Sequence, residues 1–243
     1  MSIAEKFEVI ADAVYEKGIE KGKKDEYDKF WDAYQDNGNR NYYSSAFAGN
    51  QGWNKNNFYP KYDIKPEGNA YQLFYAWEVK DKHTLDLAQR LEDCGVVLDT
   101  SKATNLQNAF GYGCFSRIPA VDITSTTNNS SGLFNASWGR LITIDKIIMN
   151  ENTQIASSWF GNGSGIQNLT IEGKIGQNNF NVKDCKKLTK ASLLSILKAL
   201  SLDITETKTI TFSTVHQSII ETDTDCKPYW EAAKNAGWSF VYA

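Results

Sequence analysis

Residues 115–123 read FSRIPAVDI, and residues 141–149 read LITIDKIIM. Both segments carry apolar residues at relative positions 0, 3, 6 and 8, and the second begins 26 residues after the first (141 − 115 = 26). Residues 166–171, IQNLTI, repeat the pattern with a second gap that is one residue shorter. Apolar residues that recur in register at a period of about 20–29 residues are typical of a leucine-rich repeat. The pattern therefore predicts stacked units whose short strands lie side by side.

Each copy follows a residue pair that ends in phenylalanine. The pairs are Ala109-Phe110, Leu133-Phe134 and Trp159-Phe160, and the predicted strands are Val121–Ile123, Ile147–Met149 and Leu169–Ile171. Because the phenylalanines recur with the strands, we expect them in the core. The predicted fold is an α/β solenoid: an irregular leucine-rich repeat array with a parallel strand ladder, an N-terminal helix and a C-terminal α/β cap.

The composition argues against several classes of function. The chain has 243 residues, of which 41% are hydrophobic, and a formal net charge of −3, so it lacks the concentrated basic surface that nucleic-acid binding needs. Four cysteines show no close C-x-x-C pair, which indicates buried, reduced thiols rather than a zinc site or a disulfide framework. The first residues, MSIAEK, give no secretory signal, and no apolar window reaches the roughly 20 residues of a membrane span.

We predict three segments along the chain. Residues 1–36 form an N-terminal helix, residues 37–188 the repeat array, and residues 189–243 the C-terminal cap. In the first segment, apolar residues step by 4, 3 and 4 through Ile3, Phe7, Ile10 and Val14. This narrow seam favours either an oligomerisation or attachment helix, with a trimer as the expected state, or an amphipathic helix that covers one end of the array.

Looser units precede and follow the regular ones. Ala46-Phe47 and Leu73-Phe74 stand where Ala109-Phe110 stands later. In the cap, Thr189 is a suitable N-cap for a helix rich in Leu and Ile. A strand over Thr209–Phe212, a helix over residues 228–236 and a strand near residues 238–242 are expected to follow.

These motifs resemble the BspA-like leucine-rich repeats of the Treponema pallidum type. The residues that match that repeat, over about residues 42–188, are Ala109-Phe110, Cys114, Ile118-Pro119 and Cys185-x-x-Leu188. The layout also resembles short proteins encoded by phages and prophages of gut Clostridia, through residues 27–35 and the ending Lys234-x-x-Gly237-Trp238. The resemblance implies a virion protein, made in the bacterial cytoplasm, that serves as a fibre or baseplate component and contacts the host surface.

The sequence carries no pattern of an enzyme. The two histidines, His83 and His216, stand in unrelated contexts without a nucleophile motif beside either. The glycine-rich segment 161–165 lacks the Gly-Lys-Ser/Thr ending of a phosphate loop. We therefore expect no catalytic residues, no metal site and no cofactor.

Aromatic residues are the candidates for binding. Four of them fall outside the strict repeat positions and beside polar loop residues: Trp53, Tyr112, Trp138 and Trp159. Such rings either form a platform for a sugar or a protein partner, or fill gaps between uneven units.

Three non-enzymatic functions follow from this reading. The first is a phage virion-associated protein that recognises a protein or polysaccharide on the host surface and forms a homo-oligomer. The second is a purely structural virion protein that packs against other virion proteins. The third is a bacterial BspA-like surface adhesin, against which the absence of a secretory signal counts.

Overall fold

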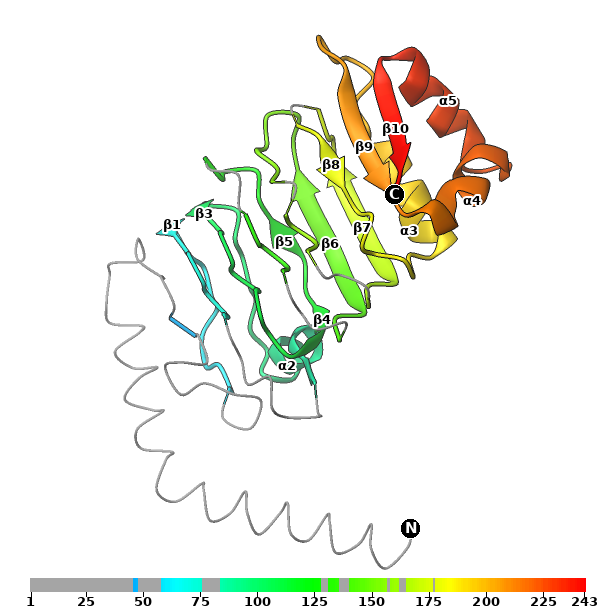
Figure 1. The fold of residues 1–243 in the computed structure, drawn as a ribbon. Coiled ribbons are helices and arrows are strands. Elements are labelled where there is room, and N and C mark those ends of the chain that lie inside the picture. The colour runs from blue at the N-terminus through cyan, green and yellow to red at the C-terminus, as the bar shows by residue number, and fades with distance from the viewer. Residues whose placement is uncertain are drawn as a thin grey trace, which may run out of the picture.

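The computed structural model describes residues 46–47, 58–75, 84–127, 131–135, 140–156, 158–161, 165–176 and 178–243 (Figure 1). The predicted helix 1–36 and its residues Ile3, Phe7, Ile10 and Val14 lie outside these ranges.

A parallel central sheet contains five of the described strands. Its order is β2-β4-β6-β5, with β7 paired to β6. The strands are β2 (Leu85–Asp86), β4 (Phe115–Ile118), β5 (Val121–Asp122), β6 (Thr143–Met149) and β7 (Asn168–Gly173). Both short strands β4 and β5 pair with the longer β6. Pro119 lies between β4 and β5 and has no N–H to donate, which explains why the ladder is interrupted there.

The pairing inside this sheet confirms the predicted register. Val121 pairs with Ile147, and Ile118 pairs with Ile144, each at the 26-residue offset of the sequence. On the other side of β6, Ile144 pairs with Leu169 and Ile147 with Ile171. The register shifts between these two pairs. The shift accounts for the one-residue shorter gap in the third copy, because the extra residue of β6 has no partner in β7.

A smaller parallel sheet lies on the N-terminal side. It pairs β1 (Gly68–Asn69) with β3 (Ala103–Asn105), and an isolated bridge joins Ile64 to Leu98. Helix α2 (Leu87–Asp93) follows β2 directly, and its N-cap Asp86 accepts a hydrogen bond from the Gln89 N–H. It ends before Gly95, which has the left-handed φ of +65° that favours glycine after a helix.

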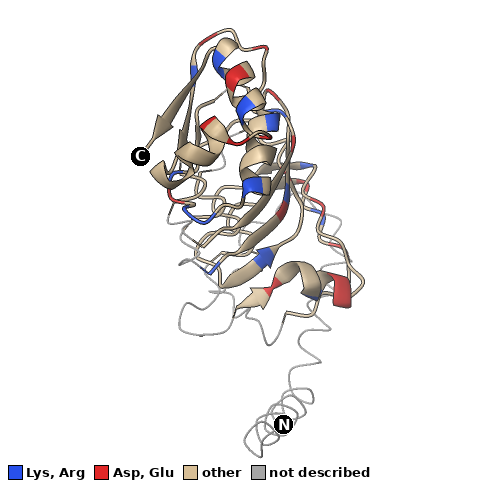
Figure 2. Cartoon of the chain, turned by 90° about the vertical axis from the view of Figure 1, so that its right-hand side faces the viewer, with Lys and Arg blue, Asp and Glu red and all other residues tan. Residues whose placement is uncertain are grey.

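A third parallel sheet, the C-terminal sheet, has the order β10-β9-β8. Its strands are β8 (Phe180–Asn181), β9 (Lys208–Phe212) and β10 (Trp238–Tyr242). The helical elements near it are α3 (Lys190–Ala199), the 3-10 helix η2 (Thr214–His216), α4 (Gln217–Thr222) and α5 (Lys227–Asn235). Figures 1 and 2 show α3, α4 and α5 gathered on one side of this sheet. The predicted N-cap Thr189, the last helix and both strands are confirmed, whereas α4 was not predicted from the sequence.

Helix α3 lies along the edge of β7 that does not pair with β6. The hydroxyl of Ser192 accepts from the Leu169 N–H at 2.9 Å and donates to the Gln167 carbonyl at 2.9 Å. One turn later, the hydroxyl of Ser195 accepts from the Ile171 N–H at 2.9 Å. Serines three residues apart face the same side of a helix, so they take the place of a neighbouring strand.

The predicted solenoid with one strand ladder is wrong as a description of this fold. The described strands divide among three separate parallel sheets, and the central sheet curls into a half-barrel in a mixed α/β arrangement (Figure 1). The physical reason is that the regular period covers only residues 115–171. Beyond β7, the serines of α3 take up the main-chain groups that a further strand would need.

One hydrophobic cluster extends through all three sheets, from Phe47 to Trp238. The predicted boundary at residues 188/189 separates β8 from its partner β9, so the C-terminal sheet draws on both predicted segments. All four cysteines are free thiols, and three of them are buried, as expected. None of the helices in the described ranges is long and apolar enough to cross a bilayer.

Candidate functional site

A column of turns runs beside the sheets and carries the predicted aromatic residues. Its members are residues 70–75, 106–112, 131–135 and 158–161. Main-chain hydrogen bonds join each turn to the next: Phe74 N–H to Ala109 O at 2.7 Å, Phe110 N–H to Leu133 O at 3.0 Å, and Phe134 N–H to Trp159 O at 3.1 Å. The turns are therefore held in register by the same kind of bond as the strands.

Phenylalanine side chains form the inner side of this turn column. The Phe stack consists of Phe47, Phe74, Phe110, Phe134 and Phe160, all at most 2% exposed. Neighbouring rings are stacked with centroids 5.5–5.8 Å apart and interplanar angles of 16–21°. The prediction that the repeated phenylalanines belong to the core is confirmed.

Tyrosines gather on the outer side of the first two turns. The rings of Tyr75 and Tyr112 meet edge to face, with centroids 5.4 Å apart and an interplanar angle of 72°. Partial burial raises the pKa of the Tyr75 phenol, and the neighbouring Tyr112 and Tyr71 raise it further. We call Tyr71, Tyr75 and Tyr112 the tyrosine cluster; each of the three is half-buried.

The backbone of Tyr112 is unusual for an aromatic residue. Its φ is +54°, in the left-handed region that non-glycine residues rarely adopt, and its N–H donates to the Asn135 carbonyl at 2.9 Å. Such a conformation costs of order 1–3 kcal/mol and persists only where the surrounding structure enforces it. The turn column enforces it here and thereby fixes the Tyr112 ring against Tyr75.

Asparagine side chains lie between the turns. A Cβ atom on Gly132 would lie 2.0 Å from Asn108 Oδ1, and one on Gly161 would lie 2.7 Å from Asn135 Oδ1. The two glycines therefore make room for the two amides. Each amide therefore lies against a glycine of the next turn, so side chains as well as main-chain bonds join neighbouring turns.

The other three aromatic residues that were candidates for binding are the tryptophans Trp53, Trp138 and Trp159. Trp159 is only 1% exposed and packs against Phe160 and Phe180, so of its two expected roles it fills the core and does not form a surface platform. Its position in the repeat explains this, because the residue before each repeated phenylalanine points into the core, as Leu133 does. Trp53 and Trp138 lie outside the described residues.

Tyr71 and Tyr75 were not predicted as binding residues. An alignment of Phe74 with Phe110 would have pointed to Tyr75, because a tyrosine follows each of these phenylalanines within two residues: Tyr75 directly and Tyr112 after one glycine. Neighbouring turns that stack bring these positions together. Tyr71 has no such signal, since its position depends on the Asx turn in which its N–H donates to Asn69 Oδ1 at 3.1 Å.

A second polar surface follows the outer face of the central sheet. Arg117 donates two hydrogen bonds to the Asp145 carboxylate, at 2.6 and 3.0 Å, and the Asp145 side chain raises the pKa of the guanidinium. Lys146 pairs with Glu172 on the neighbouring strand. Figure 2 shows both signs of charge interspersed over the visible elements. These charges neutralise one another and do not form a site for a charged ligand.

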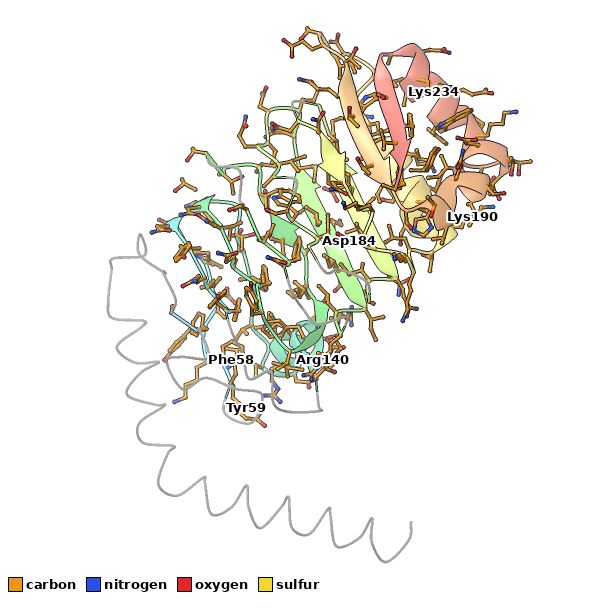
Figure 3. All side chains as sticks on the ribbon, in the orientation of Figure 1. Phe58, Tyr59, Arg140, Asp184, Lys190 and Lys234 are labelled. Atoms are coloured by element: carbon orange, nitrogen blue, oxygen red, sulfur yellow. The ribbon has the colours of Figure 1, made fainter. Side chains whose placement is uncertain are left out.

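The described titratable residues form no evident reaction centre. His216 is 3% exposed, and its Nε2 lies 3.0 Å from the Cys185 carbonyl; His83 lies outside the described residues. Asp223 and Asp225 both pair with Lys190 of α3, which is labelled in Figure 3, at 2.8 and 2.7 Å. Within the described part of the chain, no three His, Cys, Asp or Glu side chains are grouped to hold a metal ion.

Comparison with known proteins identifies no relative of this chain. No family model, no curated protein and no solved structure matches the chain.

Proposed function

We propose that this chain is a non-enzymatic recognition protein of a phage particle and that its tyrosine cluster contacts the host surface. The observation that carries the proposal is the edge-to-face contact of the half-buried Tyr75 and Tyr112 across two neighbouring turns of the hydrogen-bonded turn column.

Tyrosine suits such a contact because its ring offers apolar area while its hydroxyl binds polar groups. It also loses little conformational entropy on binding, since it has only two side-chain torsions. Edge-to-face packing already fixes Tyr75 and Tyr112 before a ligand arrives, which lowers that entropic cost further.

The turns supply a rigid support. Binding residues are often placed on loops that a regular scaffold positions. Here the ladder of main-chain bonds and the Phe stack hold adjacent turns together on their inner side. A ligand that contacts Tyr75 and Tyr112 therefore meets two turns whose separation is fixed.

A phage particle is the setting that the sequence resemblance implies. A cluster of three aromatic residues offers a small contact area, so the affinity of one copy is expected to be weak. Many copies on one particle raise the effective affinity without any new contact. A bacterial surface adhesin and a structural virion protein are the alternatives that the following experiments separate from this function.

Binding of purified full-length protein to host cells and to isolated cell-wall polysaccharide tests the recognition. We expect the double substitution Tyr75→Ala/Tyr112→Ala to weaken binding at least about 10-fold, as loss of buried aromatic contacts does at other interfaces. The matched control is Tyr229→Ala, which removes a tyrosine that is 41% exposed on α5, away from the turn column. Equal binding by the parent and the double variant, with both folded, contradicts the proposal.

Mass spectrometry of purified particles tests the setting. The recognition function predicts that the chain is found in particles and that particles with the double substitution adsorb more slowly to host cells. Particles that contain the chain but adsorb at an unchanged rate support the structural alternative. Detection on the bacterial surface without particles supports the adhesin.

A further inference from the structure

Strand β10 ends the C-terminal sheet with an unpaired side. In a parallel sheet, alternate residues of a strand direct their main-chain groups to the same neighbour. The Ala243 N–H donates to the Phe212 carbonyl at 3.0 Å, so the residues that face β9 are Ser239, Val241 and Ala243. The alternation along β9 is consistent with this, because the Val182 N–H donates to the Thr211 carbonyl, so Thr211 faces β8 and its neighbours Ile210 and Phe212 face β10. It follows that Trp238, Phe240 and Tyr242 direct their N–H and carbonyl groups away from the sheet.

Nothing among the described elements pairs with this side. The sheet order ends at β10, whose one strand partner among the described strands is β9. The Trp230 ring of α5 meets the Phe240 ring edge to face at 6.2 Å, so α5 packs on the face of the sheet that carries the Phe240 side chain. We call the outer side of β10 the open edge.

The open edge lacks the features by which proteins prevent strand pairing. Such edges usually carry a charged residue, a proline or a bulge. The sequence of residues 235–243, NAGWSFVYA, contains no charged residue and no proline. The five residue pairs between β10 and β9 run without a register shift, so β10 is regular along its length.

We infer that the open edge pairs with the same edge of a second copy of this chain. The two β10 strands run antiparallel about a two-fold axis at Phe240 and join two three-stranded sheets into one of six strands. In this register Phe240 lies opposite its own copy, Trp238 opposite Tyr242 of the second copy, and Ser239 opposite its Val241.

The side chains of β10 fit this arrangement. The two-fold register keeps Trp238, Phe240 and Tyr242 on the helix-covered face of both sheets. There the Phe240 ring is stacked on Phe212 at 6.3 Å and 7° and is only partly buried, so a second Phe240 extends the stack across the axis. On the other face Val241 is 41% exposed, and pairing with a second copy covers part of it.

The absence of charge favours a second copy as the occupant. An edge that selected a different, charged strand would be expected to carry opposite charges, as recognition surfaces do. An uncharged strand is complementary to itself, because a two-fold axis brings every side chain against a copy of its own segment without like charges. The contact is smaller than the roughly 1,600 Å² of a standard interface, so the pairing is expected to depend on protein concentration in the micromolar range.

Sedimentation velocity of the full-length protein tests this pairing and its register with two charge-matched pairs of substitutions. The side chains of Ser239 and Val241 are exposed on the face of the sheet opposite the helices, so replacing them leaves the core of one copy intact. In the proposed register, Ser239→Lys/Val241→Lys sets like charges opposite each other, whereas Ser239→Glu/Val241→Lys sets opposite charges together. Circular dichroism melting of all three proteins serves as the folding control.

We expect the parent mass to double with concentration, whatever oligomer the rest of the chain forms. The lysine pair is expected to remain at the undoubled mass, and the glutamate–lysine pair to double at a concentration at least about 3-fold lower than the parent. A parent that never doubles, or two variants that both behave as the parent does, overturns the inference. The first outcome leaves the open edge to a strand of another protein, and the second excludes this register.

Discussion

Two strand edges in this molecule are treated in opposite ways. Along β7, the edge of the central sheet is covered from Gln167 to Ile175. The Thr189 N–H donates to the Gln167 carbonyl, and the two serine hydroxyls of α3 accept from the N–H groups of Leu169 and Ile171. Beyond β7, the Ile175 N–H donates to the Ala199 carbonyl at 2.8 Å. Along β10, the edge of the C-terminal sheet has no partner in the described part of the chain.

The difference shows how a parallel ladder can be ended. A helix has no free main-chain groups in its middle, so it can satisfy a strand edge only through side chains. Ser192 and Ser195 do this because a short hydroxyl both donates and accepts. The open edge has no such helix beside it, and its main-chain groups stay available to another strand.

The two sheets also differ in the aromatic residues that support them. The central sheet lies beside the five-ring Phe stack, which is buried throughout. In the C-terminal sheet the corresponding stack has three rings, of which Phe212 is buried and Phe240 and Tyr242 are partly exposed. The covered edge therefore belongs to the better-packed sheet.

Removing one ring from each stack is expected to give the largest difference. Phe134→Ala deletes a fully buried ring between Phe110 and Phe160 and should lower the free energy of unfolding by about 3–5 kcal/mol. Phe240→Ala should cost about 1–2 kcal/mol, because its ring is only partly buried. Urea unfolding at low protein concentration, where the open edge is unpaired, measures both. Equal losses contradict the ranking of the two stacks.

Removing a hydroxyl from the covered edge is expected to have an intermediate effect. Ser192→Ala leaves the buried Leu169 N–H without an acceptor and should cost about 1–3 kcal/mol, whereas the more exposed Ser195→Ala should cost about 1 kcal/mol. Amide hydrogen exchange should show faster exchange at Leu169 and Ile171 respectively. The control is Ser218→Ala on α4, where the serine is exposed and the substitution should change stability by less than about 0.5 kcal/mol. Unchanged exchange at Leu169 in the first variant argues against the serine cover.

The smallest effect is expected from the ion pair that ties α3 to the segment before α5. The ammonium group of Lys190 lowers the pKa of Asp223, and the Asp225 N–H lowers it further. A carboxylate whose pKa is lower in the folded state stabilises the fold above its unfolded pKa of about 3.9 and loses that contribution as pH falls through the folded value. Lys190→Met should therefore melt at a lower temperature than the parent at pH 7, and the gap should close as the pH falls through the lowered pKa of Asp223. A gap that persists at low pH shows that the lysine acts through packing instead.

The sequence alone predicted the contacts that depend on regular spacing. Side chains of a strand alternate between faces, so the offset of 26 residues leaves one register that buries both Val121 and Ile147, and the structure has that register. The stacking of Phe134 on Phe160 follows from the same period (160 − 134 = 26). Thr189 at the start of α3 is a local capping signal and was equally accessible.

The contacts that decide the candidate site were not accessible in this way. The burial of Trp159 depends on Phe180, and the meeting of Tyr75 with Tyr112 depends on how two turns of unequal spacing stack. The division into three sheets depends on the placement of α3 against β7. A one-dimensional period specifies which residues recur; it does not specify which element covers the edge where the recurrence stops.

What the sequence determined by itself was the pairing of the central strands, because their apolar residues recur at a fixed separation, and the membership of the Phe stack, because each of its phenylalanines ends a recurring apolar pair. The tertiary structure alone decided where the ladder ends, which aromatic residues reach the surface, and that β10 keeps an open edge. The physical reason is that hydrogen-bond satisfaction at an edge and exposure of a ring are set by neighbours distant in the chain, whose position no local pattern records.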